Sequence, residues 1–536
     1  MKCFDSASSL LCLCLSATLL TGSVTGEDKA STHPNIIFIL ADDQGFGDVS
    51  ALNSESKIPT PNIDRLAKEG MYFSDAHTSS SVCTPTRYSV LTGRYHWRTH
   101  LQSGVLGGFS EPLIDSDRLT VAGFLKSHGY ETACVGKWHL GMNWPLKEGG
   151  TANDKGDFSK KGIAIGWNVD YTAPIKNGPV DVGFDTFFGI SASLDMPPYV
   201  YIQDRVPTEV ATVEKAFHRP GPAGASFEAV DVLPKITERT IEIIEEQGQK
   251  EKKSPFFIYF PLNAPHTPIV PSEEWKGKSG INDYGDFTMQ VDSTVGRVLD
   301  ALDSAGLAEN TLIIFTTDNG CSPQADFPTL EAAGHHPSYI YRGHKADIFE
   351  GGHRVPFLVR WPGKVKPGTR SDQIIGQFDL IATAAEIVGG KIPDGAGEDS
   401  ISFLPALLGN EETIRTSIIS QSINGSFAIR DGNWKLALCP GSGGWSNPRP
   451  GRTDFSAMPP VQLFDLSADP GEENNLATEH PDRVATMKAA LEKAVNDGRT
   501  TEGPALQNDV PVKIMKNVPK ASKPKEKAKE KKKKAA

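Results

Sequence analysis

Four apolar runs along the chain are each followed by polar or charged residues. They lie at Ile36–Ala41, Phe256–Phe260 and Leu312–Thr317 and in the segment ETACVGK, which ends at Lys137. Short runs rich in Ile, Val and Phe and bounded by Gly or Pro are typical of buried β-strands. We therefore predict four buried strands with polar side chains at their carboxyl ends.

Helical patterns lie between these runs. The segment TPNIDRLAKEG has Pro61 at its start and Gly70 just after its end, which is typical of a short helix. Apolar residues recur at helical spacing from Phe287 to Leu302, and Gly306 follows as a stop. A third helix is predicted within SDRLTVAGFLKSHG. Alternating strands and helices indicate an α/β protein with a mainly parallel sheet between two layers of helices.

The polar residues after the strands predict a ligand site. In open parallel sheets, ligands bind beyond the carboxyl ends of the strands. This rule predicts that residues far apart in the chain meet at one place: Asp42, Asp43, Lys137, His139, His266, Asp318 and Asn319. Three carboxylates and an amide oxygen favour Ca²⁺ or Mg²⁺ over zinc, which prefers His and Cys. Each residue alone also fits a helix cap or a structural histidine, so the prediction depends on their joint occurrence.

The start of the chain has the pattern of an export signal. Lys2 precedes an apolar run at Leu10–Leu20, and small residues follow, which predicts a signal peptide over residues 1–26. The run is too short to span a bilayer and no other segment reaches that length, so no transmembrane span is predicted. A buried strand, or a lipid anchor on Cys12 or Cys14, is a weaker alternative. We therefore expect an exported protein that is periplasmic, secreted or held at the cell surface.

The composition indicates a soluble protein of enzyme size, with 38% hydrophobic and 23% charged residues. A chain of 536 residues is expected to form two domains or one very large α/β domain. The segment Lys520–Ala536 holds nine Lys and two Glu, a charge of +7, and is predicted to be disordered. The net charge of −11 leaves −18 for the rest of the chain. Because nucleic-acid binding requires broad basic surfaces, no nucleic-acid partner is expected.

Cysteine use excludes a disulfide scaffold. Three of the seven cysteines lie in the predicted signal, which leaves Cys83, Cys134, Cys321 and Cys439. Four cysteines over so long a chain form at most two bridges, and there is no CxxC zinc pair. Cys83 therefore has either a structural or a chemical role.

Cys83 begins the segment CTPTR, which is followed by YSVLTGRY. These residues resemble the signature of the type I sulfatases. Further segments match that family in order: PNIIFILADDQGFGD, GYETACVGKWHLG, GFDTFFGI, APHTP, FTTDNG, GHKADIFEGGHRVP and AIRDGNWKL…LFDLSADPGEENNLA. The resemblance extends from Pro34 to Ala477. It implies an arylsulfatase-like, formylglycine-dependent enzyme of the alkaline phosphatase superfamily.

In that family the signature cysteine is oxidised to formylglycine during export by a formylglycine-generating enzyme. The resemblance therefore implies that Cys83 becomes an aldehyde whose hydrate attacks the sulfur of a sulfate ester. It also implies one Ca²⁺ ion that acts as a Lewis acid. By matched position, the metal ligands would be Asp42, Asp43, Asp318 and Asn319 together with the modified Cys83.

The resemblance assigns the remaining polar residues as well. Arg87 and Lys137 would hold the formylglycine and balance its charge, and His139 would act as a base for its second hydroxyl. His266 and Lys345 would bind the sulfate, and one of them would protonate the leaving oxygen. Positive side chains inside an acidic protein are needed to attract an anionic substrate.

The resemblance implies an alkaline-phosphatase-like fold: a large mixed, mainly parallel sheet between helices, followed by a smaller α+β subdomain with a short antiparallel sheet. We assign residues 33–414 to the catalytic domain, 415–505 to the C-terminal subdomain and 506–536 to a Lys-rich disordered tail. The segments Asn143–Val182 and Ser191–Arg205 lack periodicity, and such loops often determine specificity. Candidate substrate contacts in the loops are Asp195, Tyr199, His335 and His336.

Two other functions remain open from the sequence. The same fold serves phosphate and phosphonate ester hydrolases, although Asn319 stands where relatives with two metals usually carry His. A non-catalytic protein that binds sulfated glycans would keep Cys83 unmodified. The substrate of a sulfatase here would be a sulfated carbohydrate or a small aryl sulfate, and the export signal and long polar loops favour the carbohydrate. The sequence does not indicate the oligomeric state.

Overall fold

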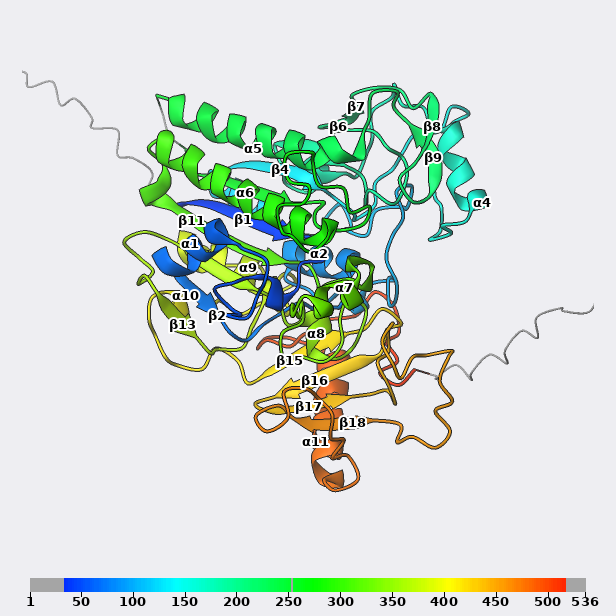
Figure 1. Ribbon diagram of the computed structural model, residues 1–536, viewed down its shortest axis with the longest axis vertical. Helices are drawn as coiled ribbons and strands as arrows, with labels where there is room; N and C mark the ends of the chain where they lie inside the picture. Colours follow the sequence, from blue (N-terminus) through cyan, green and yellow to red (C-terminus); the bar gives the residue numbers. More distant parts are fainter. Residues whose placement is uncertain (1–32, 252–253, 517–536) are drawn as a thin grey trace, which may run out of the picture.

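The computed structural model describes residues 33–251 and 254–516, and a ten-stranded sheet forms its centre (Figure 1). The strands follow the order β13 (Thr369–Ser371), β2 (Met71–Phe73), β12 (Phe357–Arg360), β11 (Thr311–Thr317), β1 (Asn35–Ala41), β10 (Phe256–Pro261), β4 (Glu131–Lys137), β5 (Thr186–Ile190), β6 (Ile202–Gln203) and β7 (Val206–Pro207). The five central strands from β11 to β5 are parallel. Antiparallel pairs flank them, β12 beside β11 and β6 beside β5. The sheet is therefore mixed and mainly parallel, as predicted.

Helices cover both faces of this sheet (Figure 1). Ile37 and Ile39 of β1 belong to the same apolar cluster as residues of α1 (Pro61–Glu69), α5 (Val232–Gln249) and α6 (Asp283–Ser304). Phe38 and Leu40 point to the other face and share a cluster with α2 (Cys83–Thr92), α3 (Val121–Ser127), α9 (Leu380–Val388) and α10 (Leu404–Leu407). This alternation explains the continuous apolar run of a strand that is buried on both sides.

The predicted elements are present with small shifts at their ends. The four predicted strands are β1, β4, β10 and β11, and the predicted helices are α1, α3 and α6. Helix α3 begins at Val121 because the Thr120 hydroxyl accepts the N–H of Gly123 at 3.0 Å and caps the helix.

A second, antiparallel sheet follows in the order β15 (Ser417–Gln421), β16 (Phe427–Asp431), β17 (Trp434–Ala437) and β18 (Gln462–Asp465). Helix α11 (Pro481–Asn496) packs on it through Met487 and Leu491. In Figure 1 this part lies below the large sheet. Short elements complete the fold: β3 (Ala76–His77) with β14 (Ile375–Gly376), β8 (Val213–Ala216) with β9 (Pro220–Ala223), and α4 (Lys160–Ile163), α7 (Phe327–Ala332) and α8 (Glu350–His353).

The predicted signal peptide and the Lys-rich segment from residue 517 onward lie outside the described residues. At residues 506–516 the structure differs from the predicted disordered tail. Val512 and Ile514 pack on the C-terminal core, and Asp509 accepts two hydrogen bonds from Arg94 at 2.8 and 3.0 Å. These apolar contacts and this ion pair hold residues 506–516 against the folded protein. The Lys-rich segment Lys520–Ala536 comes after them.

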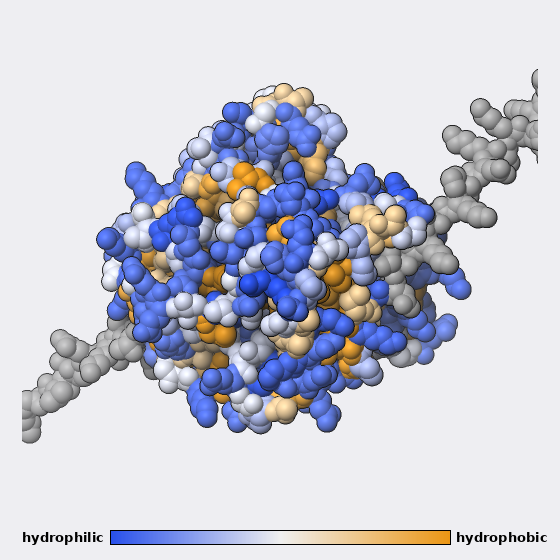
Figure 2. Space-filling model, turned by 90° about the horizontal axis from the view of Figure 1, so that it is seen from below, coloured by the Kyte–Doolittle hydropathy of each residue, from blue (hydrophilic) through white to orange (hydrophobic). Residues whose placement is uncertain are grey.

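The four cysteines within the described part of the chain are buried free thiols, so none of them forms a disulfide. Among the described helices, none combines the length and apolar character needed to cross a membrane. Figure 2 shows one face of the molecule, where hydrophilic side chains predominate and hydrophobic ones form small separate patches.

Candidate active site

Two neighbouring parallel strands bring four oxygen-bearing side chains together. Asp42 and Asp43 directly follow β1, and Asp318 and Asn319 directly follow β11. The register pairs the last residues of the two strands, Ala41 and Thr317. The Asp43 N–H donates to Asp318 Oδ1 at 3.3 Å, and Asn319 Nδ2 donates to Asp43 Oδ1 at 2.7 Å. Parallel pairing therefore explains why these two distant sequence segments share one site.

The next strands add the predicted lysine and the two histidines. At the end of β4, Lys137 Nζ lies 2.6 Å from Asp42 Oδ2. Gly136 precedes it at φ 133°, and a Cβ there would lie 1.9 Å from the carbonyl oxygen of Pro261, so glycine is required at this close approach. His139 follows in the left-handed region at φ 56°. Beyond β10, His266 Nε2 lies 3.6 Å from Asp43 Oδ2.

Helix α2 carries Cys83 as its first residue and Arg87 one turn later. Arg87 Nη2 lies 2.7 Å from Asp318 Oδ2, and its Nη1 donates to the carbonyl oxygen of Lys137 at 3.1 Å. The guanidinium therefore fixes the start of α2 against the ends of β11 and β4.

Lys345 reaches the same place from the loop before α8. Its Nζ contacts both carboxylate oxygens of Asp43, at 2.6 and 2.8 Å. The structure thus gathers the predicted site residues around the strand ends. All ten are between 0% and 6% exposed: Asp42, Asp43, Cys83, Arg87, Lys137, His139, His266, Asp318, Asn319 and Lys345.

The charges in the site are closely coupled. Burial raises the pKa of Asp42, but Lys137 and His266 outweigh it and hold that pKa well below its usual range. Burial and the nearby charge of Asp42 raise the pKa of Asp318 to about 7, despite the contact with Arg87. Like charges at close range push the two pKa values apart. The contacts of Arg87 and Lys137 therefore oppose the effect of burial on Asp318 but do not outweigh it.

The hydrogen bonds of the two histidines fix their neutral tautomers. His139 Nε2 faces the carbonyl oxygen of Leu106 at 2.9 Å and therefore carries the proton, which leaves Nδ1 as a buried acceptor without a partner. Burial, together with Lys137, lowers the pKa of His139 well below 6.5. His266 donates from Nδ1 to the carbonyl oxygen of Thr267 at 2.5 Å. Burial and then Lys345 lower the pKa of His266, although Asp43 and Asp42 oppose that effect.

The oxygen-bearing residues fit a hard divalent cation. Asp42 Oδ1 and Asn319 Oδ1 are fully buried, and neither has a hydrogen-bond partner. Leaving a carboxylate oxygen and an amide oxygen unpaired in a protein interior is costly, and coordination to a cation would satisfy both. Ligand atoms of Asp42, Asp43 and His266 lie within 4.8 Å of one another. Carboxylates and an amide oxygen are the donors that Ca²⁺ prefers.

The environment of Cys83 does not suit an ordinary thiol nucleophile. Burial raises the pKa of the thiol, although Lys137 and Lys345 oppose that effect. A raised pKa keeps the sulfur protonated, and the thiol form is a poor nucleophile.

Other buried polar residues follow the same strands and were missed from the sequence. Gln44, Ser191, Ser193 and Asn263 each have side-chain polar atoms that are buried without a partner. They follow β1, β5 and β10, in ADDQ, GISAS and PLNAP. The rule that gathered the charged residues at strand ends would have found them, had it been applied to neutral side chains.

The four candidate substrate contacts differ in their surroundings. Asp195 is buried, with Oδ2 paired to Arg219 and Oδ1 unpartnered. Although burial raises its pKa, His266 and Arg219 lower it below the usual range, which places Asp195 within electrostatic reach of the site. Tyr199 is satisfied internally, since its hydroxyl donates to the carbonyl oxygen of Arg219 at 2.6 Å.

The two candidate histidines of the later loop do not enter this site. The ring of His335 is fully buried between Asp48, at 2.7 Å, and the N–H of Lys57, at 3.2 Å, which makes it a structural residue. His336 is exposed, and the structure records no contact that ties it to the site residues. Of the four candidates, Asp195 is the one whose side chain has a buried atom without a hydrogen-bond partner.

Comparisons with known proteins agree with the predicted resemblance. The chain matches a family model described as Sulfatase over residues 34–390. It is 35% identical to an N-acetylgalactosamine-6-O-sulfatase of Bacteroides thetaiotaomicron, with 91% of this chain and 99% of that protein aligned. It is 31% identical to arylsulfatase A of Bos taurus, with 91% and 92% aligned. A solved 6S-sulfatase structure, from work on glycosaminoglycan metabolism by Bacteroides thetaiotaomicron, superposes with a TM-score of 0.73 at 33% identity and covers 87% of this chain and 99% of that one.

Proposed function

Because the chain belongs to the sulfatase family, we propose that it removes sulfate from a sulfated carbohydrate, using a formylglycine made from Cys83 and one calcium ion. The observation that carries this proposal is the contact of Arg87 with Asp318 at 2.7 Å. It joins the helix that begins at Cys83 to the carboxylates that suit a metal. A nucleophile and a cation at one place are what cleavage of an anionic ester requires.

The two groups would supply chemistry that the unmodified side chains lack. A hydrated aldehyde at residue 83 supplies two hydroxyls on one carbon, one to attack sulfur and one to release the sulfate afterwards. A bound calcium ion would supply positive charge to balance the anionic substrate. Asp42, Asp43, Asp318 and Asn319 would hold the ion, and two of them have unpartnered oxygens for it.

The cations of the site orient and neutralise the substrate. Lys345, which contacts Asp43, would bind a sulfate oxygen, and Arg87 and Lys137 would hold the modified side chain. His139 has the unprotonated, unpartnered Nδ1 that a base requires. Burial lowers the pKa of His266 in the free protein, and an adjacent sulfate anion would favour its protonated form, which can donate to the leaving oxygen.

The proposed substrate is a 6-O-sulfated amino sugar within a larger glycan. Two relatives with that activity in their names support it, the Bacteroides enzyme and a mouse N-acetylgalactosamine-6-sulfatase that is 28% identical. A buried carboxylate with a free oxygen, on Asp195, suits a sugar hydroxyl better than an aryl ring.

The proposal includes export and one partner protein. The predicted signal over residues 1–26 would direct the chain out of the cytoplasm. Sulfated polysaccharides are found outside the cell, so export would bring the protein to its substrate. Conversion of Cys83 requires a formylglycine-generating enzyme that reads CTPTR. In the folded protein Cys83 is 3% exposed and Arg87 is 0% exposed. The modifying enzyme would therefore have to act on this segment before the chain folds.

Hydrolysis of a substrate panel by protein purified from its native host tests this function. We expect release of sulfate from 6-O-sulfated N-acetylgalactosamine, less from other sugar sulfates, and none from aryl phosphates. Fast hydrolysis of aryl sulfate without any turnover of sugar sulfates would refute the carbohydrate assignment. Faster turnover of phosphate or phosphonate esters would favour the alternative chemistry of the superfamily.

Replacing Asp195 is expected to change specificity more than catalysis. In Asp195→Ala, KM for the sugar sulfate should rise roughly 10-fold, because a hydroxyl contact is lost, while aryl sulfate hydrolysis stays the same. Steady-state kinetics with both substrates measure this. Tyr199→Phe is the matched control from the same loop, since its hydroxyl is satisfied within the protein and its removal should leave both KM values unchanged. An equal loss on both substrates in Asp195→Ala would contradict the assignment.

A further inference from the structure

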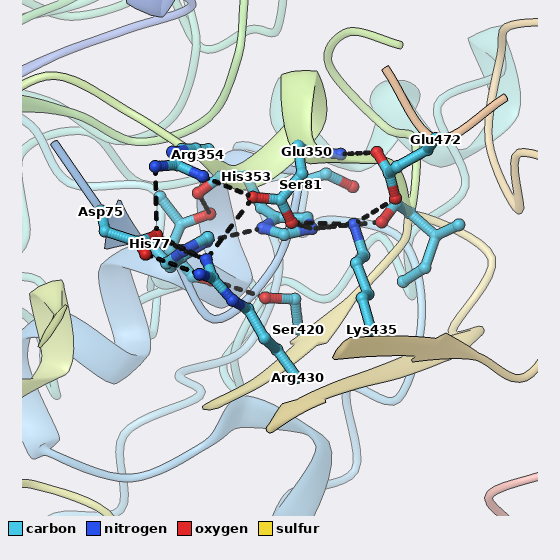
Figure 3. Close-up of polar contacts among 12 residues, drawn as sticks. Asp75, His77, Ser81, Glu350, His353, Arg354, Ser420, Arg430, Lys435 and Glu472 are labelled. Carbon is cyan, nitrogen blue, oxygen red and sulfur yellow. Dashed lines mark hydrogen bonds and ion pairs between the residues drawn. The ribbon is translucent and has the colours of Figure 1, made fainter. Parts of the chain in front are cut away.

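A second buried cluster of charged side chains joins the catalytic domain to the C-terminal sheet (Figure 3). We call it the interdomain cluster. It consists of three cations, three carboxylates and two histidines: Arg354, Arg430, Lys435, Asp75, Glu350, Glu472, His77 and His353. Three of the segments that resemble the sulfatase family supply members, namely GHKADIFEGGHRVP, AIRDGNWKL and LFDLSADPGEENNLA. None of these residues belongs to the active site described above.

Lys435 is the centre of one half of the cluster. It lies on β17, is 1% exposed, and reaches into the catalytic domain. Its Nζ lies 3.0 Å from Glu350 Oε1, 2.8 Å from Glu472 Oε1 and 3.0 Å from His353 Nε2. The Glu350 N–H, at the start of α8, also donates to Glu472 Oε2 at 2.6 Å. One lysine therefore joins two buried carboxylates from separate segments.

Arg430 is the centre of the other half. From β16, its two terminal nitrogens contact the two oxygens of Asp75 at 2.5 and 2.7 Å, a forked pair of charge-assisted hydrogen bonds. His77 on β3 lies 2.8 Å from the same carboxylate. His77 Nδ1 in turn lies 3.1 Å from His353 Nδ1, which connects the two halves.

The interdomain cluster lies beside the segment that leads into Cys83. Directly after β3, the C-terminal strand β15 pairs with this segment: Gln421 N–H donates to Ser79 O at 3.1 Å, and Ser81 N–H donates to Gln421 O at 3.0 Å. Cys83 follows two residues later and begins α2. The C-terminal sheet is therefore bonded to the backbone that positions the predicted nucleophile.

Backbone hydrogen bonds also connect the loop of Lys345 to the Cys83 segment and to the C-terminal subdomain. The N–H of Ala346, the next residue, donates to Ser81 O at 2.8 Å, and Ile423 N–H donates to Ala346 O at 3.0 Å. Helix α8, which Lys435 contacts through Glu350, begins five residues after Lys345. The loops of Cys83 and Lys345 thus meet each other and the C-terminal subdomain beside one cluster.

The charge of the cluster argues against a metal site. His77, Glu350 and His353 have ligand atoms within 4.8 Å of one another, which is close enough for an ion. However, Lys435 already lies 3.0 Å from His353, and Arg430 lies 3.2 Å from His77. Three cations balance three carboxylates, so the positive charge that an ion would supply is already present. The arrangement instead has the features of a structural connection.

We propose that Lys435 is a positioning residue of the active site, which holds the loops of Cys83 and Lys345 in their working arrangement by fixing α8 to the C-terminal sheet. The kinetic part of this inference rests on the proposed function, whereas the structural part does not. Removing this buried cation takes away the ion-pair partner of Glu472 and leaves Glu350 only its longer contacts with Arg354 and Arg430, at 3.3 and 3.9 Å, so the connection opens.

Lys435→Met tests this proposal with two independent measurements. The change keeps the length of the side chain and removes its charge. We expect kcat for the sugar sulfate to fall about 100-fold at unchanged formylglycine content, since small displacements of catalytic groups have effects of that size. Hydrogen exchange followed by mass spectrometry should become faster in residues 78–88 and 342–350. Both measurements are made below the unfolding temperature of the variant.

Leu491→Ala is the matched control. Leu491 is fully buried in α11 of the same subdomain and belongs to an apolar cluster that includes none of the charged residues, so its loss destabilises the fold without removing an ion pair of the connection. We expect a lower Tm with wild-type kcat and wild-type exchange in the two segments. If Leu491→Ala reproduces both changes, or Lys435→Met shows neither, the proposal is overturned.

Two further outcomes are decisive as well. If Lys435→Met does not fold, Glu472→Gln removes the negative charge of one partner of the lysine at constant shape, and the same pattern is expected with roughly a 10-fold fall in kcat. A wild-type protein without any sulfate ester hydrolysis would refute the proposed function. In that case the exchange experiment alone decides on the connection: faster exchange only in the cluster variant supports it, and unchanged exchange overturns it.

Discussion

Cys83→Ala is expected to lower hydrolysis of the sugar sulfate by at least about 10⁴-fold, because removing a covalent nucleophile leaves only binding and electrostatic effects. Burial raises the pKa of the Cys83 thiol, so an unmodified thiolate is disfavoured as the nucleophile. The measurement is kcat/KM, together with the mass of the peptide that contains residue 83. In active wild-type protein this peptide should be lighter than its cysteine form and should react with a hydrazide.

Cys439→Ala is the control for this experiment. Cys439 is also a buried free thiol, but it lies in the C-terminal subdomain, where its sulfur contacts the carbonyl oxygen of Gly441 at 3.1 Å. The control should keep wild-type activity and the aldehyde at residue 83. Active native protein with an intact Cys83 thiol would contradict the formylglycine proposal, and an inactive one would favour a glycan-binding role.

The polar residues at the strand ends could be placed from the sequence because strand geometry is local. Asp42 and Asp318 each follow an apolar run, and parallel pairing of β1 with β11 brings the two run ends together. The same reasoning placed Lys137 and His266. It needed only the positions where apolar runs stop, and no knowledge of the loops.

The assignments of Cys83, Arg87 and Lys345 depended on the family resemblance. No apolar run ends at these residues, and Lys345 reaches Asp43 from the loop between α7 and α8. Periodicity carries no information on how such a loop returns to the site. The structure supplies that information through backbone contacts between Ala346 and Ser81.

The interdomain cluster was not predicted, and the reason is physical. In AIRDGNWKLAL, Arg430 and Lys435 alternate with apolar residues, a pattern typical of a strand with one face in water. Here the polar face of β16 and β17 instead packs on the catalytic domain, so both cations are buried. Alternation shows that a strand has two different faces, but it does not show what covers the polar one.

Calcium removal is the second large effect that we expect. Chelation, or Asp42→Asn, should lower kcat/KM by at least about 10³-fold, since charge stabilisation at the site is lost. The structural reason is the set of buried carboxylates and unpartnered oxygens, which only a cation satisfies together. Differential scanning calorimetry provides a readout without turnover. At 100 times its Kd, calcium should stabilise the wild-type fold by about 2.7 kcal/mol and the variant by much less.

Asp286→Asn separates the loss of a ligand from the loss of a buried carboxylate. Asp286 is 2% exposed and accepts only local hydrogen bonds, from the N–H groups of Gly277 and Ser279 at 2.6 and 2.7 Å. Its replacement should lower Tm but keep the full calcium increment. Asp42→Asn should lose that increment, although it also leaves Lys137 without its partner at 2.6 Å. If calcium stabilises both variants equally, the ion does not bind at the ends of β1 and β11, and the unpartnered oxygens there need another explanation.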